Sequence, residues 1–138
     1  MSASLTISTL NPNVQVQTVQ TRLTYLNVLE HVRTHDIVLD CTDNAPTRHL
    51  LNAACVYLHK PLISGSAIGT DGQITLYYKQ HNLPTGDHHS SCYACMYPPN
   101  FINKPVQNCD SCNDAGVLGT VPGTIGILAA TECIKFIT

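Results

Sequence analysis

The sequence predicts an α/β fold with a mixed sheet, built by one domain of 138 residues. Short β-branched runs alternate with segments in which apolar residues recur at helical spacing, and this alternation favours helices packed on a sheet. Apolar residues make up 43% of the chain and charged residues 12%. At this length such a composition can bury a hydrophobic core, so we expect a globular chain rather than a disordered one.

The first 24 residues are mostly polar and carry little periodic pattern. Residues 1–10 show no helical periodicity. Apolar and polar residues alternate over residues 14–20, which predicts an edge strand with one face in water. A short helix is expected over roughly residues 25–34, because apolar residues recur there at helical spacing.

A strand followed by a helix is predicted in the middle of the chain. Residues 36–40 form a short β-branched run that suits a buried parallel strand. A helix should follow, with Asn44 as its N-cap and Pro46 in its first turn. Its apolar face consists of Leu50, Leu51, Ala54 and Leu58.

The second half of the chain predicts two further strands and a final helix. Residues 61–64 suit a buried strand, and residues 72–78 alternate as a third strand. The pattern then vanishes, so a long crossover loop is expected over about residues 80–119. The last helix is expected over residues 124–137. Three glycines are expected to allow close packing before this helix and in its first turn: Gly119, Gly123 and Gly126.

The charge balance excludes several classes of function. The chain has 7 Lys and Arg against 9 Asp and Glu, which argues against docking to nucleic acid through a basic surface. The longest apolar stretches, such as residues 123–130, fall short of the roughly 20 residues that cross a bilayer. The N-terminus lacks the basic flank and apolar segment of a signal peptide. We therefore expect a cytoplasmic protein that binds neither membranes nor nucleic acid directly.

Polar residues gather where the strand at 36–40 ends and the next helix begins, the place at which α/β sheets bind ligands. Asp43 could hold Mg²⁺, because this cation prefers oxygen ligands and bridges to phosphates. Asn44 could donate to a phosphate or a ribose, although helix capping alone would also explain it. Arg48 could pair with a phosphate or with Asp43, or could be a solvated surface residue.

A C-x-x-C pair, Cys92 and Cys95, predicts a zinc half-site. Two thiolates at this spacing can reach one tetrahedral Zn²⁺, which needs four ligands, and His88 or His89 could supply one. A redox pair is the alternative. Zinc is favoured, because a thioredoxin-like pair opens a helix and this one runs directly into Met-Tyr-Pro-Pro.

A second C-x-x-C pair, Cys109 and Cys112, has two interpretations. It could complete the zinc site. A loop thiol near a helix N-terminus could also act as a nucleophile on an activated acyl group. The other three cysteines lie in or beside apolar runs and are expected to behave as small core residues: Cys41, Cys55 and Cys133.

The glycine-rich turn of a nucleotide-binding α/β domain, G-x-G-x-x-G, does not occur in the sequence. If the chain handles nucleotides, we expect it to hold only part of the site.

The order of the motifs resembles one family. The motifs are Asp-Ile-Val-Leu-Asp-Cys-Thr-Asp-Asn at 36–44, Arg48, Pro-Leu-Ile-Ser-Gly at 61–65, Gly-Gln-Ile-Thr at 72–75, Cys-Tyr-Ala-Cys at 92–95 and Ala-Gly-Val-Leu-Gly at 115–119. Together they resemble the ThiF/MoeB-type, ubiquitin-activating-like adenylyltransferases. The branch that they resemble most comprises the eukaryotic enzymes that activate sulfur-carrier proteins for molybdopterin synthesis, tRNA thiolation and protein urmylation.

The resemblance implies a Rossmann-like, ThiF-type fold and a reaction in which ATP adenylates the C-terminal glycine of a ubiquitin-like sulfur carrier. It assigns Asp43 to Mg²⁺ with ATP and Asn44 to the nucleotide pocket. It assigns Cys92 and Cys95 to zinc, with a second pair of cysteines that follows the last helix in the family. The loop thiol that receives the activated carrier corresponds to Cys112 or, less well, to Cys109. The intact family implies a homodimer.

The resemblance also implies that residues 1–138 form only the C-terminal half of a ThiF-type catalytic domain, because the family's glycine-rich turn should precede residue 1. Adenylyltransferase ancestry is implied, and activity of the isolated chain is left open. The alternative function is a non-catalytic zinc-binding interaction module that pairs with a full-length subunit or a carrier protein.

Overall fold

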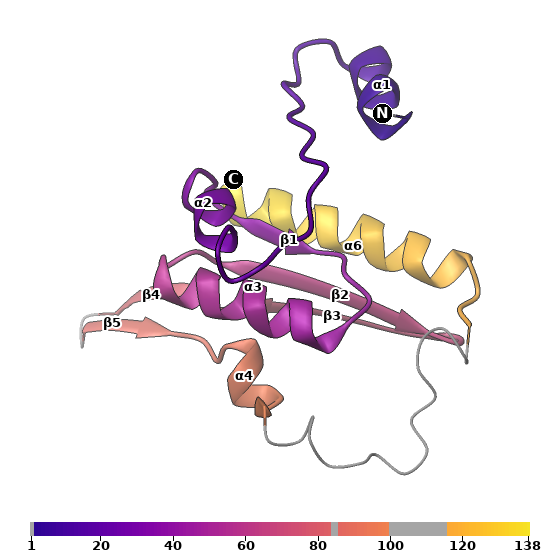
Figure 1. Ribbon diagram of the computed structural model, residues 1–138. Helices are drawn as coiled ribbons and strands as arrows, with labels where there is room; N and C mark the ends of the chain where they lie inside the picture. The colour runs from indigo at the N-terminus through magenta and orange to yellow at the C-terminus, as the bar shows by residue number, and fades with distance from the viewer. Residues whose placement is uncertain (1, 84–85, 100–115) are drawn as a thin grey trace.

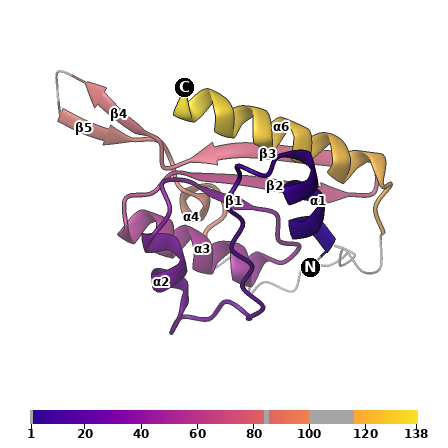
Figure 2. The same cartoon turned by 90° about the horizontal axis from the view of Figure 1, so that it is seen from above.

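Three strands form the central sheet of the computed structural model, which describes residues 2–83, 86–99 and 116–138. These strands are β1 (Val38–Asp40), β2 (Leu62–Ile68) and β3 (Asp71–Tyr77), in the order β1-β2-β3. β1 and β2 are parallel, whereas β2 and β3 are antiparallel. Helices cover both faces of the sheet (Figures 1 and 2). The predicted α/β fold with a mixed sheet is confirmed.

The helix α3 (Ala45–Tyr57) connects β1 to β2 and begins where the sequence predicted. Asn44 is its N-cap, since the Asn44 Oδ1 atom accepts a hydrogen bond from the backbone N–H of Thr47 at 2.9 Å. Pro46 lies in the first turn, where its missing N–H leaves no hydrogen bond unmade. The N-terminus of α3 therefore lies just past the carboxyl end of β1.

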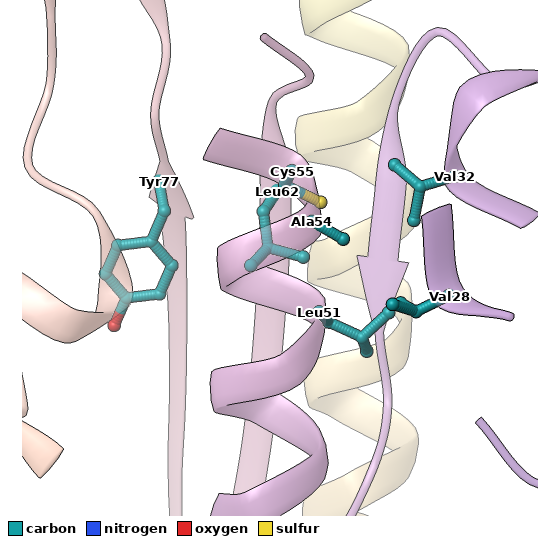
Figure 3. Close-up of a cluster of buried hydrophobic side chains, with 7 residues drawn as sticks. All are labelled: Val28, Val32, Leu51, Ala54, Cys55, Leu62 and Tyr77. Carbon is teal, nitrogen blue, oxygen red and sulfur yellow. The ribbon is translucent and has the colours of Figure 1, made fainter. Parts of the chain in front are cut away.

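A hydrophobic core fills the space between α3, the sheet and the short helix α2 (Val28–Arg33) (Figure 3). Its buried members are Val28, Val32, Leu51, Ala54, Cys55, Leu62 and Tyr77. Full burial of one aliphatic side chain contributes about 1.5–3 kcal/mol, so this cluster fixes α3 on the sheet. α2 confirms the helix predicted near residues 25–34, over a shorter range.

The helix α6 (Thr120–Ile137) covers the opposite face of the sheet and contacts β2 and β3. Its close approach depends on two sheet glycines. A Cβ atom built at Gly65 would lie 2.9 Å from Ile125, and one built at Gly72 would lie 2.7 Å from Ile125.

The predicted packing glycines of this region do not serve that purpose. A Cβ atom built at Gly119, Gly123 or Gly126 would meet no other atom within 4 Å. The prediction was wrong because α6 approaches the sheet through its Ile125 side, and the space for that side chain comes from glycines of the strands.

The outer face of α6 is apolar and exposed. Ile127 is 70% exposed, and Leu128, Ile134 and Ile137 also face outward. Judged by length and composition alone, α6 is the one helix in the described part of the chain that could span a membrane. Its contacts with β2 and β3 show that it forms a layer of the α/β fold.

The N-terminal segment differs from its prediction. Ser2–Leu10 form a helix, α1, and residues 14–20 contain no strand. Val14, Val16 and Val19 are exposed, and the segment runs away from the sheet (Figure 1). An alternating pattern forms a strand only beside a partner edge, and none lies next to this segment in the described structure. Leu5 and Leu10 of α1 are exposed, so this helix buries no apolar face that a periodic pattern could have indicated.

The segment after β3 contains more regular structure than predicted. β4 (Gln80–Leu83) and β5 (Gly86–His89) form an antiparallel hairpin, and the one-turn helix α4 (Tyr93–Met96) follows. The hairpin strands are mostly polar, so no alternation of apolar residues indicated them. A bridge between Gly69 and Val117 then places the start of α6 beside the end of β2.

Candidate functional site

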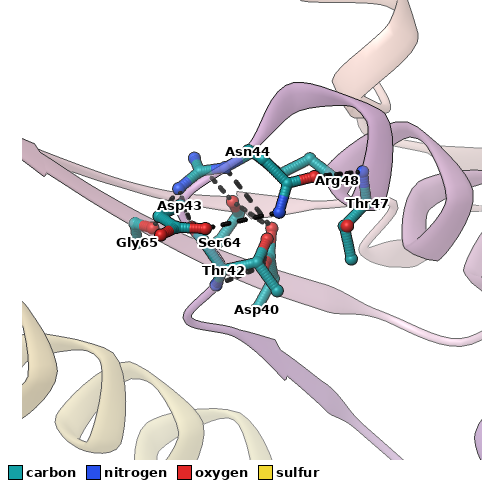
Figure 4. Close-up of polar contacts among 8 residues, drawn as sticks. All are labelled: Asp40, Thr42, Asp43, Asn44, Thr47, Arg48, Ser64 and Gly65. Atoms are coloured by element: carbon teal, nitrogen blue, oxygen red, sulfur yellow. Dashed lines mark hydrogen bonds and ion pairs between the residues drawn. The ribbon is translucent and has the colours of Figure 1, made fainter. Parts of the chain in front are cut away.

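A buried carboxylate, Asp40, organises the carboxyl end of β1 (Figure 4). Asp40 is 1% exposed. Its Oδ1 atom accepts hydrogen bonds from the backbone N–H and the hydroxyl of Thr42, at 2.8 and 2.7 Å. Its Oδ2 atom accepts one from the Ser64 hydroxyl of β2 at 3.0 Å. Asp40 therefore joins the turn after β1 to the neighbouring strand.

Arg48, in the first part of α3, points back toward this carboxylate. Its Nε atom lies 3.9 Å from the Oδ2 atom of Asp40, and its side chain is 12% exposed. Its Nη2 group donates to the carbonyl oxygens of Thr42 and Gly65, the latter at 2.8 Å. The structure thus pairs Arg48 with Asp40 rather than with Asp43, and does not leave it as a solvated surface residue.

Asp43 and Asn44 lie at the surface, at the end of this turn, which spans residues 41–44. The Asn44 Nδ2 group donates to the Asp43 Oδ1 atom at 3.3 Å, while the Asn44 Oδ1 atom caps α3. The Asp43 carboxylate is therefore oriented by its neighbour and still faces solvent. The capping explanation for Asn44 is confirmed for its oxygen, and a role in nucleotide binding stays a prediction.

A cavity of about 800 Å³ opens beside Asp43, between the strand ends and α6. Its polar lining includes Thr42, Asp43, Arg48, Asp71 and Gln73. Its apolar lining includes Ala67, Ile68, Val117, Pro122 and Ile125. Its volume lies in the range of pockets that hold cofactors and drug-sized ligands.

Some cavity residues escaped the sequence analysis. Asp71 and Gln73 lie at the start of β3, and the sequence indicated only a strand there. Cys41 was expected in the core, yet it is exposed and lines the cavity, because it follows the last residue of β1. Cys55 is buried as predicted, and Cys133 is partly buried.

A second cavity of about 180 Å³ adjoins the first, since Arg48, Ser66, Gln73 and Tyr93 line both. Its four other lining residues all carry hydroxyl groups: Ser64, Thr75, Tyr77 and Tyr97. Burial raises the pKa of Tyr77 and of Tyr93, so both phenols stay protonated at neutral pH. Two of these hydroxyls already have partners within the protein, since that of Ser64 donates to Asp40 and that of Tyr97 donates to Gln73.

The thiols of Cys92 and Cys95 lie together at the start of α4. Their Sγ atoms are 3.3 Å apart, close to the roughly 3.8 Å that two thiolates take on one tetrahedral zinc ion. Burial by itself raises the pKa of Cys92, but hydrogen bonds with Cys95 and with the Asn52 side chain lower it overall. Asn52 also accepts a hydrogen bond from the Tyr93 N–H at 2.8 Å. The pair fits two positions of a zinc site.

The sequence analysis disfavoured a redox pair partly because this pair was not expected to open a helix. That reason was wrong, since Cys92 is the N-cap of α4 and the pair opens a short helix. No third His, Cys, Asp or Glu ligand joins the two thiols within the described residues. The ring of His89 stacks on Tyr78, with ring centroids 4.3 Å apart. Cys109, Cys112 and the side chain of His88 lie outside the described part of the structure, so their roles stay predictions.

The fold is that of a partial Rossmann-like α/β domain, and its polar cavity lies at the carboxyl ends of β1 and β2, the edge at which sheets of this class generally bind ligands. The chain matches the ThiF family over residues 1–138 and therefore belongs to that family. It is 44% identical over 136 residues to the adenylyltransferase and sulfurtransferase MOCS3 of Drosophila sechellia, covering 99% of this chain and 28% of that protein.

Plant relatives are equally similar. Over 129 residues the chain is 45% identical to the adenylyltransferase and sulfurtransferase MOCS3-1 of Zea mays, covering 94% of this chain and 25% of that protein. It is 49% identical over 112 residues to MOCS3-2 of the same plant, covering 81% of this chain and 21% of that protein. The chain thus spans about a quarter of the length of these relatives.

Proposed function

We propose that this chain carries part of a site at which ATP adenylates the C-terminal glycine of a ubiquitin-like sulfur-carrier protein. The observation that carries the proposal is the exposed carboxylate of Asp43 at the edge of the 800 Å³ cavity. It lies at the carboxyl end of a parallel strand and beside the N-terminus of α3. The names of the relatives, which describe adenylyltransferases, support the same reaction class.

The cavity suits a nucleotide with its cation. One carboxylate together with phosphate oxygens is a common way for proteins to hold Mg²⁺, and Asp43 faces solvent where such a cation could enter. The N-terminus of the 13-residue helix α3 carries a partial positive charge, which favours phosphate nearby. Asp43 therefore binds Mg²⁺·ATP in this proposal, and Asn44 orients the Asp43 carboxylate.

A carboxylate becomes a good acyl donor only after one of its oxygens is converted into a leaving group. Mg²⁺ would supply charge compensation on the phosphates during that step. In this proposal the residues of this chain hold the reactants, with Asp43 at the cation and apolar residues of α6 and β2 forming one wall of the cavity. The adjoining cavity lined by hydroxyl groups makes this side of the site polar.

Zinc belongs to the proposal as a structural ion. Cys92 and Cys95 would provide two thiolates, and their separation of 3.3 Å supports this. The remaining ligands would come from Cys109 and Cys112, or from a pair that this chain does not contain. Cys112 is the proposed thiol that receives the activated carrier, and Cys109 is the competing candidate.

The carrier protein, a homodimer of the complete protein and a cytoplasmic location complete the proposal. The carrier protein and the homodimer are carried over from what the ThiF family resemblance implies. The location rests on the charge balance and on the apolar stretches of the sequence. Molybdopterin synthesis, tRNA thiolation and protein urmylation are the pathways that such a carrier would serve.

The alternative function, a zinc-binding interaction module, is favoured by the exposed apolar face of α6 and the open edge of β1. Calorimetric titration with ATP and Mg²⁺ separates the two functions. Affinity in the micromolar range supports the adenylyltransferase site. No detectable heat, in protein that retains its zinc, supports the module.

A further inference from the structure

The guanidinium group of Arg48 joins three separate segments of the chain. Its Nη2 group donates to the carbonyl oxygen of Thr42, in the turn after β1, and to that of Gly65 in β2 at 2.8 Å. Its Nε atom lies 3.9 Å from the Asp40 carboxylate. Arg48 itself belongs to α3, so one side chain holds the helix, the turn and the strand together (Figure 4).

The charge of Arg48 is already compensated inside the protein. Asp40 is 1% exposed, and a charged group buried so deeply is destabilising unless an opposite charge and hydrogen bonds compensate it. Arg48 supplies the charge, and Thr42 and Ser64 supply hydrogen bonds. The guanidinium is thus directed at atoms of its own chain rather than at a phosphate in the cavity.

Thr42, the residue immediately before Asp43, is fixed at three points. Its N–H and its hydroxyl bind Asp40, and its carbonyl oxygen accepts from Arg48. Two of these contacts come from the buried carboxylate and one from the guanidinium. The backbone that presents the Asp43 carboxylate to the cavity therefore has little freedom to move.

We propose that Arg48 is a positioning residue, which fixes the 41–44 turn through Thr42 and Gly65 and thereby places the Asp43 carboxylate for its cation. The part that concerns the cation rests on the proposed function. The part that concerns the turn stands on the contacts above. This role differs from the nucleotide-binding role predicted for Arg48 from the sequence.

The role requires arginine rather than a positive charge alone. A guanidinium presents several N–H groups in a planar fork, whereas a lysine ammonium is a compact point charge. Arg48 faces Asp40 with its Nε atom and both carbonyl oxygens with its Nη2 group, whereas a lysine has one side-chain nitrogen and cannot occupy both positions. The variant Arg48→Lys keeps the buried charge balanced and removes the bridge. Arg33→Lys, at the exposed end of α2, is the matched control.

The first test is amide hydrogen exchange without nucleotide. In Arg48→Lys, we expect the Thr42 amide to exchange about tenfold faster, the effect of losing roughly one hydrogen bond. Amides at 51–55 in the same helix should keep their wild-type rates, and Arg33→Lys should change neither group. Unchanged exchange at Thr42 would overturn the proposal. Faster exchange throughout α3 would also overturn it, by showing a general loss of stability.

The second test is calorimetry with Mg²⁺·ATP on the same variants. We expect Arg48→Lys to weaken binding about 10-fold to 100-fold, as the loss of an outer partner does at metal sites. Weaker binding with unchanged exchange at Thr42 would show direct contact with the nucleotide and overturn the positioning role. If the wild-type chain binds no Mg²⁺·ATP, the proposed function fails, and the exchange data alone decide whether Arg48 fixes the turn.

Discussion

Gly72 of β3 and Ile125 of α6 are in such close contact that a Cβ atom built at Gly72 would lie 2.7 Å from two side-chain carbons of Ile125. We predict that Gly72→Ala lowers the free energy of unfolding by about 1–3 kcal/mol, because Ile125 must leave its place against the sheet. Urea denaturation of the variant and of the wild type measures this difference.

Gly123→Ala is the control for that prediction. Gly123 lies in α6, and a Cβ atom there would meet nothing within 4 Å. Alanine at this position should raise the free energy of unfolding by about 0.4–1 kcal/mol, because it lowers the conformational entropy of the unfolded chain. In a protein that already carries Ile125→Ala, Gly72→Ala should lower the free energy of unfolding by almost nothing. The same cost in both backgrounds would show that Ile125 is not the cause.

Cys55 should make stability depend on alkaline pH. Burial, with a contribution from the charge of Asp40, raises the pKa of the Cys55 thiol from 9.0 to about 12. A thiol whose pKa is higher in the folded state stabilises the protein below its unfolded pKa. That contribution is lost as the pH rises from about 9 toward 12. Urea denaturation under reducing conditions at pH 8 and pH 10 should show the loss.

The variant Cys55→Ala tests whether this thiol is the source. The decrease in stability between pH 8 and pH 10 should be smaller in the variant than in the wild type. An identical decrease would assign the effect to other groups, such as Tyr77 and Tyr93, whose pKa values burial also raises.

Much of the fold was predictable where the signal is local. The cap of α3 at Asn44 and the proline in its first turn act within one helical turn, so the sequence located this helix start correctly. The strand predicted at 14–20 failed because a strand needs a partner edge, which local alternation cannot guarantee. The glycines that admit α6 were misassigned because only the packed structure shows that Gly65 and Gly72 face Ile125.

Zinc should be present in the freshly purified protein, at about one ion per chain or per pair of chains. Cys92→Ser should release it, because a hydroxyl is a poor ligand for zinc and the site loses one of its two paired thiolates. Elemental analysis measures the metal content. Cys133→Ser, which changes a partly buried thiol of α6, should keep its zinc. Zinc-free wild-type protein would contradict the prediction.

Cys112 should be the thiol that reacts first with iodoacetamide at neutral pH. Coordination would occupy the lone pairs of Cys92 and Cys95 and slow their reaction. Timed labelling followed by peptide mapping gives the order of modification. Faster modification of Cys109 would transfer the assignment to that residue. Equally slow reaction of Cys109 and Cys112 would indicate a zinc site built from both C-x-x-C pairs.

The candidate site was predictable in its residues more than in its contacts. Asp43 and Arg48 were identified from their place after a buried strand, and both line the cavity. The partner of Arg48 was missed, because sequence spacing does not show that Asp40 points inward and Asp43 outward. The hydroxyl-lined cavity was missed for a similar reason, since Ser64, Tyr77 and Tyr97 come from three separate segments.

The central claim is that Asp43 holds the cation of Mg²⁺·ATP, and calorimetry with Asp43→Asn, made in a protein that also contains the family's glycine-rich half of the site, tests it most directly. A neutral amide is a much weaker ligand for a hard dication. Asp43→Asn should therefore weaken Mg²⁺·ATP binding by more than the factor of about 10 to 100 that is typical when a residue supporting a metal ligand is lost. Asp36→Asn, an exposed carboxylate near Lys60, is the control and should bind like the wild type. Abolished Mg²⁺-dependent binding in Asp43→Asn alone is the predicted result, and binding retained at wild-type affinity would contradict the account.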